Sequence, residues 1–185
     1  MQKHIIIGIT GAPGSGKTTV SKMLGKQLRI KIIDADKIAW KILEKPEVKK
    51  KLVKTFGNDI IFNGKISRQI LASRAFSSAA GVKKLNSIMH PYILKEIKQK
   101  LKNNMIIDAP LLIETGLHKK CDYVIAVKCS KNFIEKRNKR YNIKERTKYH
   151  LPQKEKLKHA DFVVDNNGIR AATRRQVKAL MKFFR

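Results

Sequence analysis

The sequence has no apolar run long enough to cross a membrane. A transmembrane helix needs roughly 20 consecutive apolar residues, and no stretch of the 185 residues approaches that length. Residues 1–4 lead into a short apolar run that enters a glycine-rich loop, without the cleavage region of a signal peptide. We therefore expect a cytoplasmic protein with no membrane partner.

Cysteine is scarce as well, since only Cys121 and Cys129 occur. Their spacing fits neither a CxxC redox pair nor a zinc site. Because both flank a predicted strand, we expect them to be buried or half-buried free thiols. Free thiols suit a reducing compartment.

Acidic residues are few: 14 Asp and Glu stand against 42 Lys and Arg, and the formal net charge is +28. Such a basic field attracts phosphates, whether those of a nucleic acid or those of small polyphosphate substrates. Arginine, which is favoured over lysine for base and phosphate recognition, makes up only 10 of the 42 basic residues. We therefore expect no specific nucleic-acid partner and only weak, non-specific binding at low salt.

Five short apolar runs alternate with helix-prone segments and predict five strands, at 5–9, 30–33, 104–107, 123–127 and 162–164. This alternation predicts a parallel sheet with helices on both faces, in a three-layer α/β/α arrangement. No internal repeat is present. We expect a monomer with a single domain, 1–185, in which every strand ends at the same edge of the sheet, where ligands bind in such folds.

Two segments stand apart from this alternation. Residues 37–102 read as mostly helical, and Ser67 is the predicted N-cap of one of the helices. Breaks are expected where proline or glycine occurs, at Pro46, Gly57, Gly64 and Pro91. Residues 130–157 are polar, basic and helix-prone.

The loop after the first strand matches the pattern Gly-x-x-x-x-Gly-Lys-Ser/Thr over residues 11–18. It follows an apolar strand and opens an amphipathic helix over 18–28, the context that a phosphate-binding loop requires. The residues that would hold ATP are Gly11, Ala12, Pro13, Gly14, Ser15, Gly16, Lys17, Thr18 and Thr19. Lys17 would reach the β and γ phosphates, and the Thr18 hydroxyl would bind Mg²⁺.

This loop alone does not separate kinases from other nucleotide hydrolases. The chain lacks the Asn-Lys-x-Asp sequence that reads guanine in GTPases, and motor ATPases usually need a longer chain. The short distance from Lys17 to a pair of aspartates, Asp34 and Asp36, favours a small-molecule kinase.

Carboxylates follow the second and third strands. Alternation along an extended strand would point Asp34 and Asp36 the same way, so that one could orient an acceptor hydroxyl. Alternatively, Asp36 caps a helix that starts near Ile38. Asp108 could hold Mg²⁺ through water or simply end its strand in a turn. Glu114, expected at the start of the next helix, could contact substrate or cap that helix.

Further motifs run along nearly the whole chain and resemble those of the dephospho-CoA kinase family, a family of P-loop kinases. These are Asp34-Ala35-Asp36, Ser67-Arg68-x-x-Leu71, Leu85-Asn86 through His90-Pro91, Pro110-Leu111-Leu112-x-Glu114, and Ala160-Asp161 through Asn166-x-Gly168. The resemblance implies that ATP phosphorylates the ribose 3′-hydroxyl of dephospho-CoA, giving coenzyme A and ADP. It implies a P-loop NTPase fold with a helical acceptor-binding region at 37–102 and a lid at 130–157.

The resemblance also implies residue roles. Asp36 would accept or orient the 3′-hydroxyl, with Asp34 beside it in the substrate site. Arg68, His90 and Glu114 would line that site, and Asn166 and Gly168 would pack around the adenine of ATP. On the residues alone, His90 reads as a helix start before Pro91 and Asn166 to Gly168 as an ordinary turn.

The chain departs from the family pattern at several positions. Ser67 stands where Asp is usual, His150 where Gln is typical, and Trp40 where Arg is common, so one anion contact is missing. The lid is several residues short. Arg137 and Arg140 are three apart, share a helix face, and either clamp phosphate as catalytic residues or lie on a solvated basic helix.

Two rival functions remain open at this point. Another nucleoside or nucleotide kinase would share the phosphate loop but not the Pro-Leu-Leu-x-Glu and His-Pro sequences. A P-loop nucleic-acid-binding factor would make the net charge its main feature.

Overall fold

The computed structural model describes residues 4–137 and 150–184. Contacts between residues divide the chain into two compact units. We call the residues up to Asp34, together with those from Leu101 onward, the sheet unit, and Ala35–Lys100 the helical unit. The helical unit coincides closely with the predicted segment 37–102.

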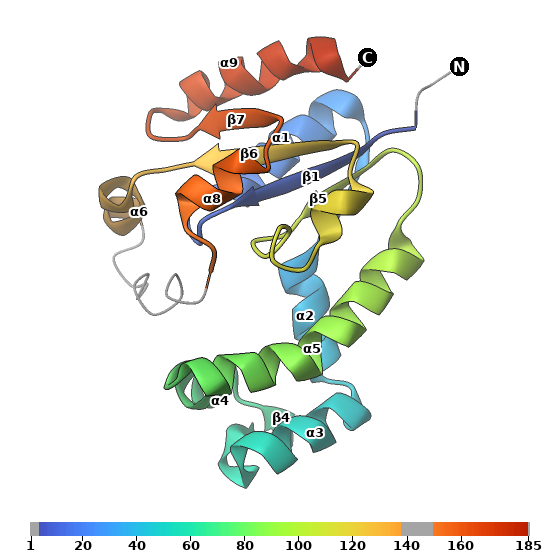
Figure 1. Cartoon of the computed structure of the whole chain (residues 1–185), viewed down its shortest axis with the longest axis vertical. Coiled ribbons are helices and arrows are strands. Elements are labelled where there is room, and N and C mark those ends of the chain that lie inside the picture. Colours follow the sequence, from blue (N-terminus) through green and yellow to red (C-terminus); the bar gives the residue numbers. More distant parts are fainter. Residues whose placement is uncertain (1–3, 138–149, 185) are drawn as a thin grey trace. The chain divides into compact units, whose positions relative to one another are not determined.

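The sheet unit is built on five parallel strands in the order β2-β5-β1-β6-β7 (Figure 1). The strands are β1 (Ile6–Gly11), β2 (Lys31–Asp34), β5 (Met105–Asp108), β6 (Tyr123–Lys128) and β7 (Phe162–Asp165). All five strand predictions are confirmed to within one or two residues at each end. The central strands are mostly apolar because both of their faces are covered: Ile7, Ile9, Ile106 and Ile107 have no exposed surface.

Helices cover both faces of this sheet, as predicted. In the described part of the sheet unit, the helical elements are α1 (Lys17–Leu28), α6 (Lys131–Arg137), α8 (Gln153–Lys158), α9 (Arg170–Leu180) and the 3₁₀ turns η2 (Leu117–Lys120) and η3 (Met181–Phe183). Figure 1 shows α1 behind the sheet and α8 in front of it. Val20 and Leu24 of α1 and Val177 of α9 belong to the buried core that these helices form with the strands.

The helical unit consists of helices packed around α5, with one small hairpin. Its elements are α2 (Ala35–Leu43), α3 (Pro46–Phe56), η1 (Asn58–Ile60), β3 (Ile61–Phe62), β4 (Lys65–Ile66), α4 (Arg68–Phe76) and α5 (Ala79–Lys100). The breaks at Pro46 and Gly57 are confirmed, and the Ser67 hydroxyl caps α4 by accepting from the Ile70 amide. The antiparallel hairpin β3-β4 was not predicted, because its strands are only two residues long.

The break expected at Pro91 is wrong, because α5 continues through it. Proline removes one amide donor from a helix and crowds the preceding turn. Here the helix buries Val82, Met89 and Ile97 on both sides of that position and packs against α2, α3 and α4. Tertiary packing therefore outweighs the local cost, and His90 lies inside a helix and does not start one.

None of the helices in the described part of the chain is long and apolar enough to cross a membrane.

Candidate active site

The phosphate-loop sequence forms a turn that only glycine can make at two of its positions. Gly16 has φ of 92°, and a Cβ atom there would lie 2.1 Å from the Asn166 Nδ2 atom. Gly11 has φ of 152°, and its Cβ would lie 2.6 Å from the Val127 carbonyl oxygen. The loop therefore packs against the backbone of β6 and against the Asn166 side chain just after β7. No side chain among the described residues caps α1 at Gly16, and such a helix N-terminus attracts anions.

Lys17 lies inside this loop and not on the surface of the helix. It is only 7% exposed, and its ammonium donates to the Ala12 carbonyl at 3.2 Å. One turn later the Ser21 hydroxyl donates to the Lys17 carbonyl at 2.9 Å. The charge of Lys17 is thus held against the loop that would bind the phosphates.

A carboxylate and a hydroxyl meet beside Lys17 at the end of β5. Asp108 is 4% exposed, and the Lys17 charge and the side chains of Thr18 and Ser21 influence its carboxyl group. Burial raises its pKa, against the lowering effects of the Lys17 charge and of the Thr18 and Ser21 side chains. Its register partner on β2 is Asp34, whose charge raises the pKa further.

These groups fit a magnesium ion. Mg²⁺ prefers oxygen ligands and usually keeps several waters and substrate phosphates in its coordination shell. The Oδ2 atom of Asp108 is buried without a hydrogen-bond partner among the described residues, and the described residues hold no cluster of three or more metal-binding side chains. An ion here would therefore use the Thr18 hydroxyl, Asp108 through water, and the nucleotide, as the sequence predicts.

The structure separates Asp34 from Asp36. β2 ends at Asp34 and α2 begins at Ala35, so Asp36 lies in the first turn of a helix and not on an extended strand. The prediction that alternation points the two side chains the same way is therefore wrong. The alternative, in which Asp36 caps a helix starting near Ile38, is wrong for the same reason. The negative charge of Asp36 lies where the helix dipole favours it.

Glu114 is bound to a lysine that the sequence analysis missed. It lies in a turn before η2, so its expected place at a helix start is wrong. Its Oε1 atom accepts from the Lys156 ammonium at 2.7 Å and from the Leu151 amide at 3.0 Å. Lys156, on α8, is 1% exposed and also donates to the Pro110 carbonyl. Burial lowers the pKa of Lys156, while the hydrogen bond and charge of Glu114 raise it.

Lys156 was missed because it is one of several lysines in a basic, helix-prone segment. The Pro-Leu-Leu-x-Glu sequence could have indicated a cationic partner for its acid, but nothing in the spacing says which lysine provides it. In the structure, Glu114 ties the loop after β5 to the segment that leads into α8. Whether it also contacts the acceptor stays a prediction.

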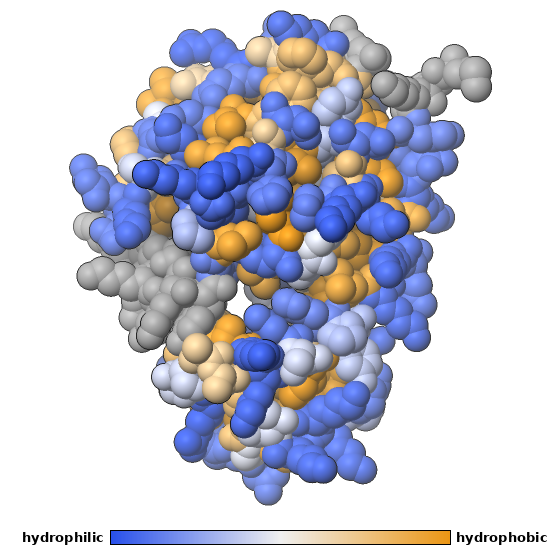
Figure 2. Space-filling model, viewed as in Figure 1, coloured by the Kyte–Doolittle hydropathy of each residue, from blue (hydrophilic) through white to orange (hydrophobic). Residues whose placement is uncertain are grey.

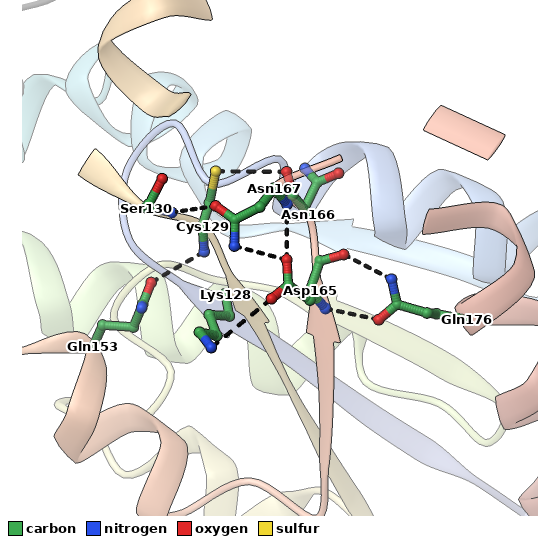
Figure 3. Close-up of polar contacts among 8 residues, drawn as sticks. All are labelled: Lys128, Cys129, Ser130, Gln153, Asp165, Asn166, Asn167 and Gln176. Carbon is green, nitrogen blue, oxygen red and sulfur yellow. Dashed lines mark hydrogen bonds and ion pairs between the residues drawn. The ribbon is translucent and has the colours of Figure 1, made fainter. Parts of the chain in front are cut away.

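The ends of β6 and β7 are joined by a network of polar side chains (Figure 3). Asn167 accepts from the Ser130 amide at 2.7 Å and donates to Asp165, and Asp165 forms an ion pair with Lys128 at 3.8 Å. Gln153 of α8 accepts from the Cys129 amide at 3.2 Å. The segment expected to pack around adenine is therefore a turn held in place by side-chain hydrogen bonds and an ion pair. Both thiols are free, as predicted.

Asn166 links this turn to the phosphate loop. Its side chain is buried, donates to the Ser15 carbonyl at 2.7 Å and accepts from the Thr173 hydroxyl at 2.8 Å. Its side chain is thus engaged by protein on both sides, and its contact with adenine stays a prediction. The Gly168 carbonyl accepts from the Arg137 guanidinium at 3.0 Å, so Arg137 bridges α6 to this turn. Arg140 lies outside the described residues.

Two predicted acceptor residues, Arg68 and His90, belong to the helical unit. Arg68 is the first residue of α4, and its guanidinium carbon lies 4.6 Å from the centre of the Trp40 ring. His90 lies in the middle of α5. The structure thus gathers the ATP residues and Asp34, Asp108 and Glu114 in the sheet unit, and Asp36, Arg68 and His90 in the helical unit.

The family model for dephospho-CoA kinase matches residues 5–171. The chain belongs to the dephospho-CoA kinase family. A dephospho-CoA kinase from Fusobacterium nucleatum is 41% identical over 175 residues, which cover 89% of this chain and 90% of that protein.

Solved structures agree with the assignment to the dephospho-CoA kinase family. A dephospho-CoA kinase from Campylobacter jejuni superposes with a TM-score of 0.69 and 26% identity, over 96% of this chain and 95% of that one. A Thermus thermophilus protein superposes with a TM-score of 0.76 and 27% identity, over 99% of this chain and all of its own. The resemblance read from the sequence motifs is confirmed, as are the three-layer fold and the kinase class.

Proposed function

We propose that this chain transfers the γ-phosphoryl group of ATP to the ribose 3′-hydroxyl of dephospho-CoA, giving coenzyme A and ADP. The observation that carries the proposal is the family match over residues 5–171, joined to a glycine loop that can hold phosphates. The oxygen of the acceptor hydroxyl forms the new bond to phosphorus as the bond to the β-phosphate oxygen breaks. The hydroxyl proton goes to a carboxylate.

The residues of the chain divide this work. The loop amides and Lys17 bind the β and γ phosphates, where negative charge shifts toward the leaving oxygen during transfer. Asp36 accepts the proton of the 3′-hydroxyl. Arg137 and Arg140 stabilise charge on the transferred group, and Arg68, His90 and Glu114 line the acceptor site.

Thr18 and Asp108 would hold Mg²⁺, which would neutralise charge on the β and γ phosphates. Asp34 lies beside Asp108 at the same strand end and would support the water shell of the ion. We place the reaction in the cytoplasm, a location supported by the two free thiols.

The direct test incubates the protein with ATP, Mg²⁺ and dephospho-CoA and looks for coenzyme A by mass spectrometry. Lys17→Ala is the matched control: it should keep the fold, measured by thermal unfolding, and lose transfer. Folded wild-type protein that binds ATP but yields no coenzyme A above the enzyme-free control would overturn the proposal. Near-normal turnover by Lys17→Ala would mean that the loop is not the site of transfer.

A further inference from the structure

The helical unit has an exposed aromatic side chain, Trp40, on α2. Trp40 is 48% exposed, although tryptophan is usually well buried. The buried residues of this helix are Ile38, Ile42 and Leu43, so Trp40 lies away from the core of the unit. Nearly half of the Trp40 surface is thus open to solvent.

Trp40 has a cationic partner in Arg68 of α4. The Arg68 guanidinium carbon lies 4.6 Å from the ring centre, within the range of a cation–π contact. An arginine stacked in this way keeps its N–H donors at the edge of the guanidinium plane, where they can bind phosphate oxygens. The pair thus joins an apolar stacking surface to anion-binding donors.

Trp40 also stands four residues after Asp36 on the same helix. Residues at this spacing share a helix face, with Cβ atoms about 5–6 Å apart. Asp36 and Trp40 are both exposed, whereas Ile38 between them is buried. If Asp36 takes the proton of a ribose hydroxyl, the base carried by that sugar is within reach of the Trp40 ring on the same helix face.

In dephospho-CoA that group is adenine. We propose that Trp40 is a specificity-determining residue that stacks on the adenine of the acceptor, while Arg68 donates to the acceptor phosphates. The inference rests on the proposed function. Trp40 would contact the base of the acceptor, and Arg68 its phosphates.

Fluorescence tests the stacking directly, because Trp40 is the only tryptophan in the chain. With the ATP site filled by a non-hydrolysable ATP analogue and Mg²⁺, dephospho-CoA should quench the emission as base and indole stack. The same concentrations of 4′-phosphopantetheine, which lacks the adenosine, should leave it unchanged. Equal quenching by both compounds, or none by dephospho-CoA at concentrations that saturate turnover, would overturn the proposal.

Kinetics provides the second test. Replacing an aromatic residue that stacks on a base with alanine lowers the affinity roughly 10- to 100-fold. Trp40→Ala should therefore raise the KM for dephospho-CoA by about that factor. The KM for ATP should stay within about twofold, and Trp40→Phe should recover most of the loss, because phenylalanine also stacks. Phe62→Ala is the matched control, since Phe62 is 67% exposed on the hairpin of the same unit and should leave both KM values unchanged.

The outcomes separate this inference from the proposed function. A wild-type protein that makes no coenzyme A would end both. If coenzyme A is made but Trp40→Ala keeps the wild-type KM for dephospho-CoA, only the stacking is wrong. If Trp40→Phe is as impaired as Trp40→Ala and both keep the wild-type melting temperature, the indole has a role other than stacking, and the proposal is wrong.

Discussion

At the scale of single residues, Asp36 is the position where chemistry and structure can be told apart. Asparagine keeps the size of the side chain but cannot accept a proton as a carboxylate does. Because Asp36 lies exposed in the first turn of α2, losing its charge there costs only about 0.3–1 kcal/mol of folding free energy. A lost general base costs about 10²–10⁴-fold in turnover.

We therefore expect Asp36→Asn to lower kcat by about 10²-fold or more while the KM for ATP and the melting temperature change little. Asp34→Asn is the control, since Asp34 ends β2 in register with Asp108 and should affect turnover less. Steady-state kinetics and thermal unfolding of both variants check this. The reverse order of effects would transfer the base role to Asp34, and near-normal turnover in both variants would remove that role altogether.

Cys121 should be chemically inert in the folded protein. Burial raises its pKa to about 12, with the neighbouring Asp122 charge adding to the effect. A raised pKa keeps the thiol protonated, and the thiolate is the species that alkylating agents attack. At pH 8 we expect iodoacetamide to modify the native protein at Cys121 much more slowly than the urea-unfolded protein, as measured by peptide mass mapping. Equal rates would show that the thiol is exposed and ionised.

The functional residues at strand ends were predicted from the sequence more reliably than the residues with which they form hydrogen bonds and ion pairs. The loop glycines, Asp108 and the free cysteines follow from local pattern, because each lies next to a mostly apolar strand. The Lys156–Glu114 pair and the Asn166–Ser15 hydrogen bond join residues 42 and 151 positions apart. Such pairings depend on tertiary packing, which no local pattern encodes. The start of α2 at Ala35 was missed because the strand passes into the helix without a loop.

At the scale of elements, the contact of α8 with the loop after β5 rests on a buried ion pair. Breaking such a pair from one side leaves a buried charge unmatched, whereas removing both charges together costs less. Lys156→Met should destabilise the protein by roughly 1–3 kcal/mol, and so should Glu114→Gln. The double variant should lose clearly less than the sum of the two.

Urea unfolding of the two single variants and the double variant measures this coupling. Lys158→Met is a suitable control, since that lysine lies on the same short helix but is largely exposed in its ion pair with Glu155. Additive losses would mean that the two side chains act independently in solution. Such a result would leave α8 held by its backbone contacts and by Gln153.

The middle of α5 shows that tertiary packing can also outweigh a local helix-breaking signal. Proline predicted a break at Pro91, yet the 22-residue helix passes through it because residues on both sides are buried against three neighbouring helices. The strands, by contrast, were predicted nearly to the residue. A strand buried on both faces needs a continuous apolar run, and that signal is strong even in a short segment.

At the scale of the whole molecule, the formal net charge of +28 has to be explained separately from the active site. On the face drawn in Figure 2, hydrophilic residues are spread over many elements and do not gather in one patch. A dispersed field of lysines gives non-specific attraction that salt removes. We expect oligonucleotide binding that weakens steeply between 50 and 200 mM salt and shows no sequence preference.

Fluorescence anisotropy with oligonucleotides of two unrelated sequences measures this, next to an acceptor-dependent ATPase assay. Tight binding of one sequence at physiological salt, without turnover of dephospho-CoA, would instead favour a nucleic-acid-binding factor. Binding that competes with ATP would place the oligonucleotide on the phosphate loop.

The order of strands in the sheet unit has a consequence for synthesis of the chain. β1 is made first, yet its two neighbours in the sheet, β5 and β6, begin about a hundred residues later, with Ile6 paired to Met105 and Ile7 to Tyr123. At translation rates of about 5–20 residues per second, β1 therefore has no partner strand for several seconds after it is made. β2 likewise has no partner strand until β5 is made. The helical unit, Ala35–Lys100, is made without interruption in that interval. The nascent chain thus exposes an isoleucine-rich strand on the ribosome during that interval, and chaperones that shield such strands would act before residue 105 emerges.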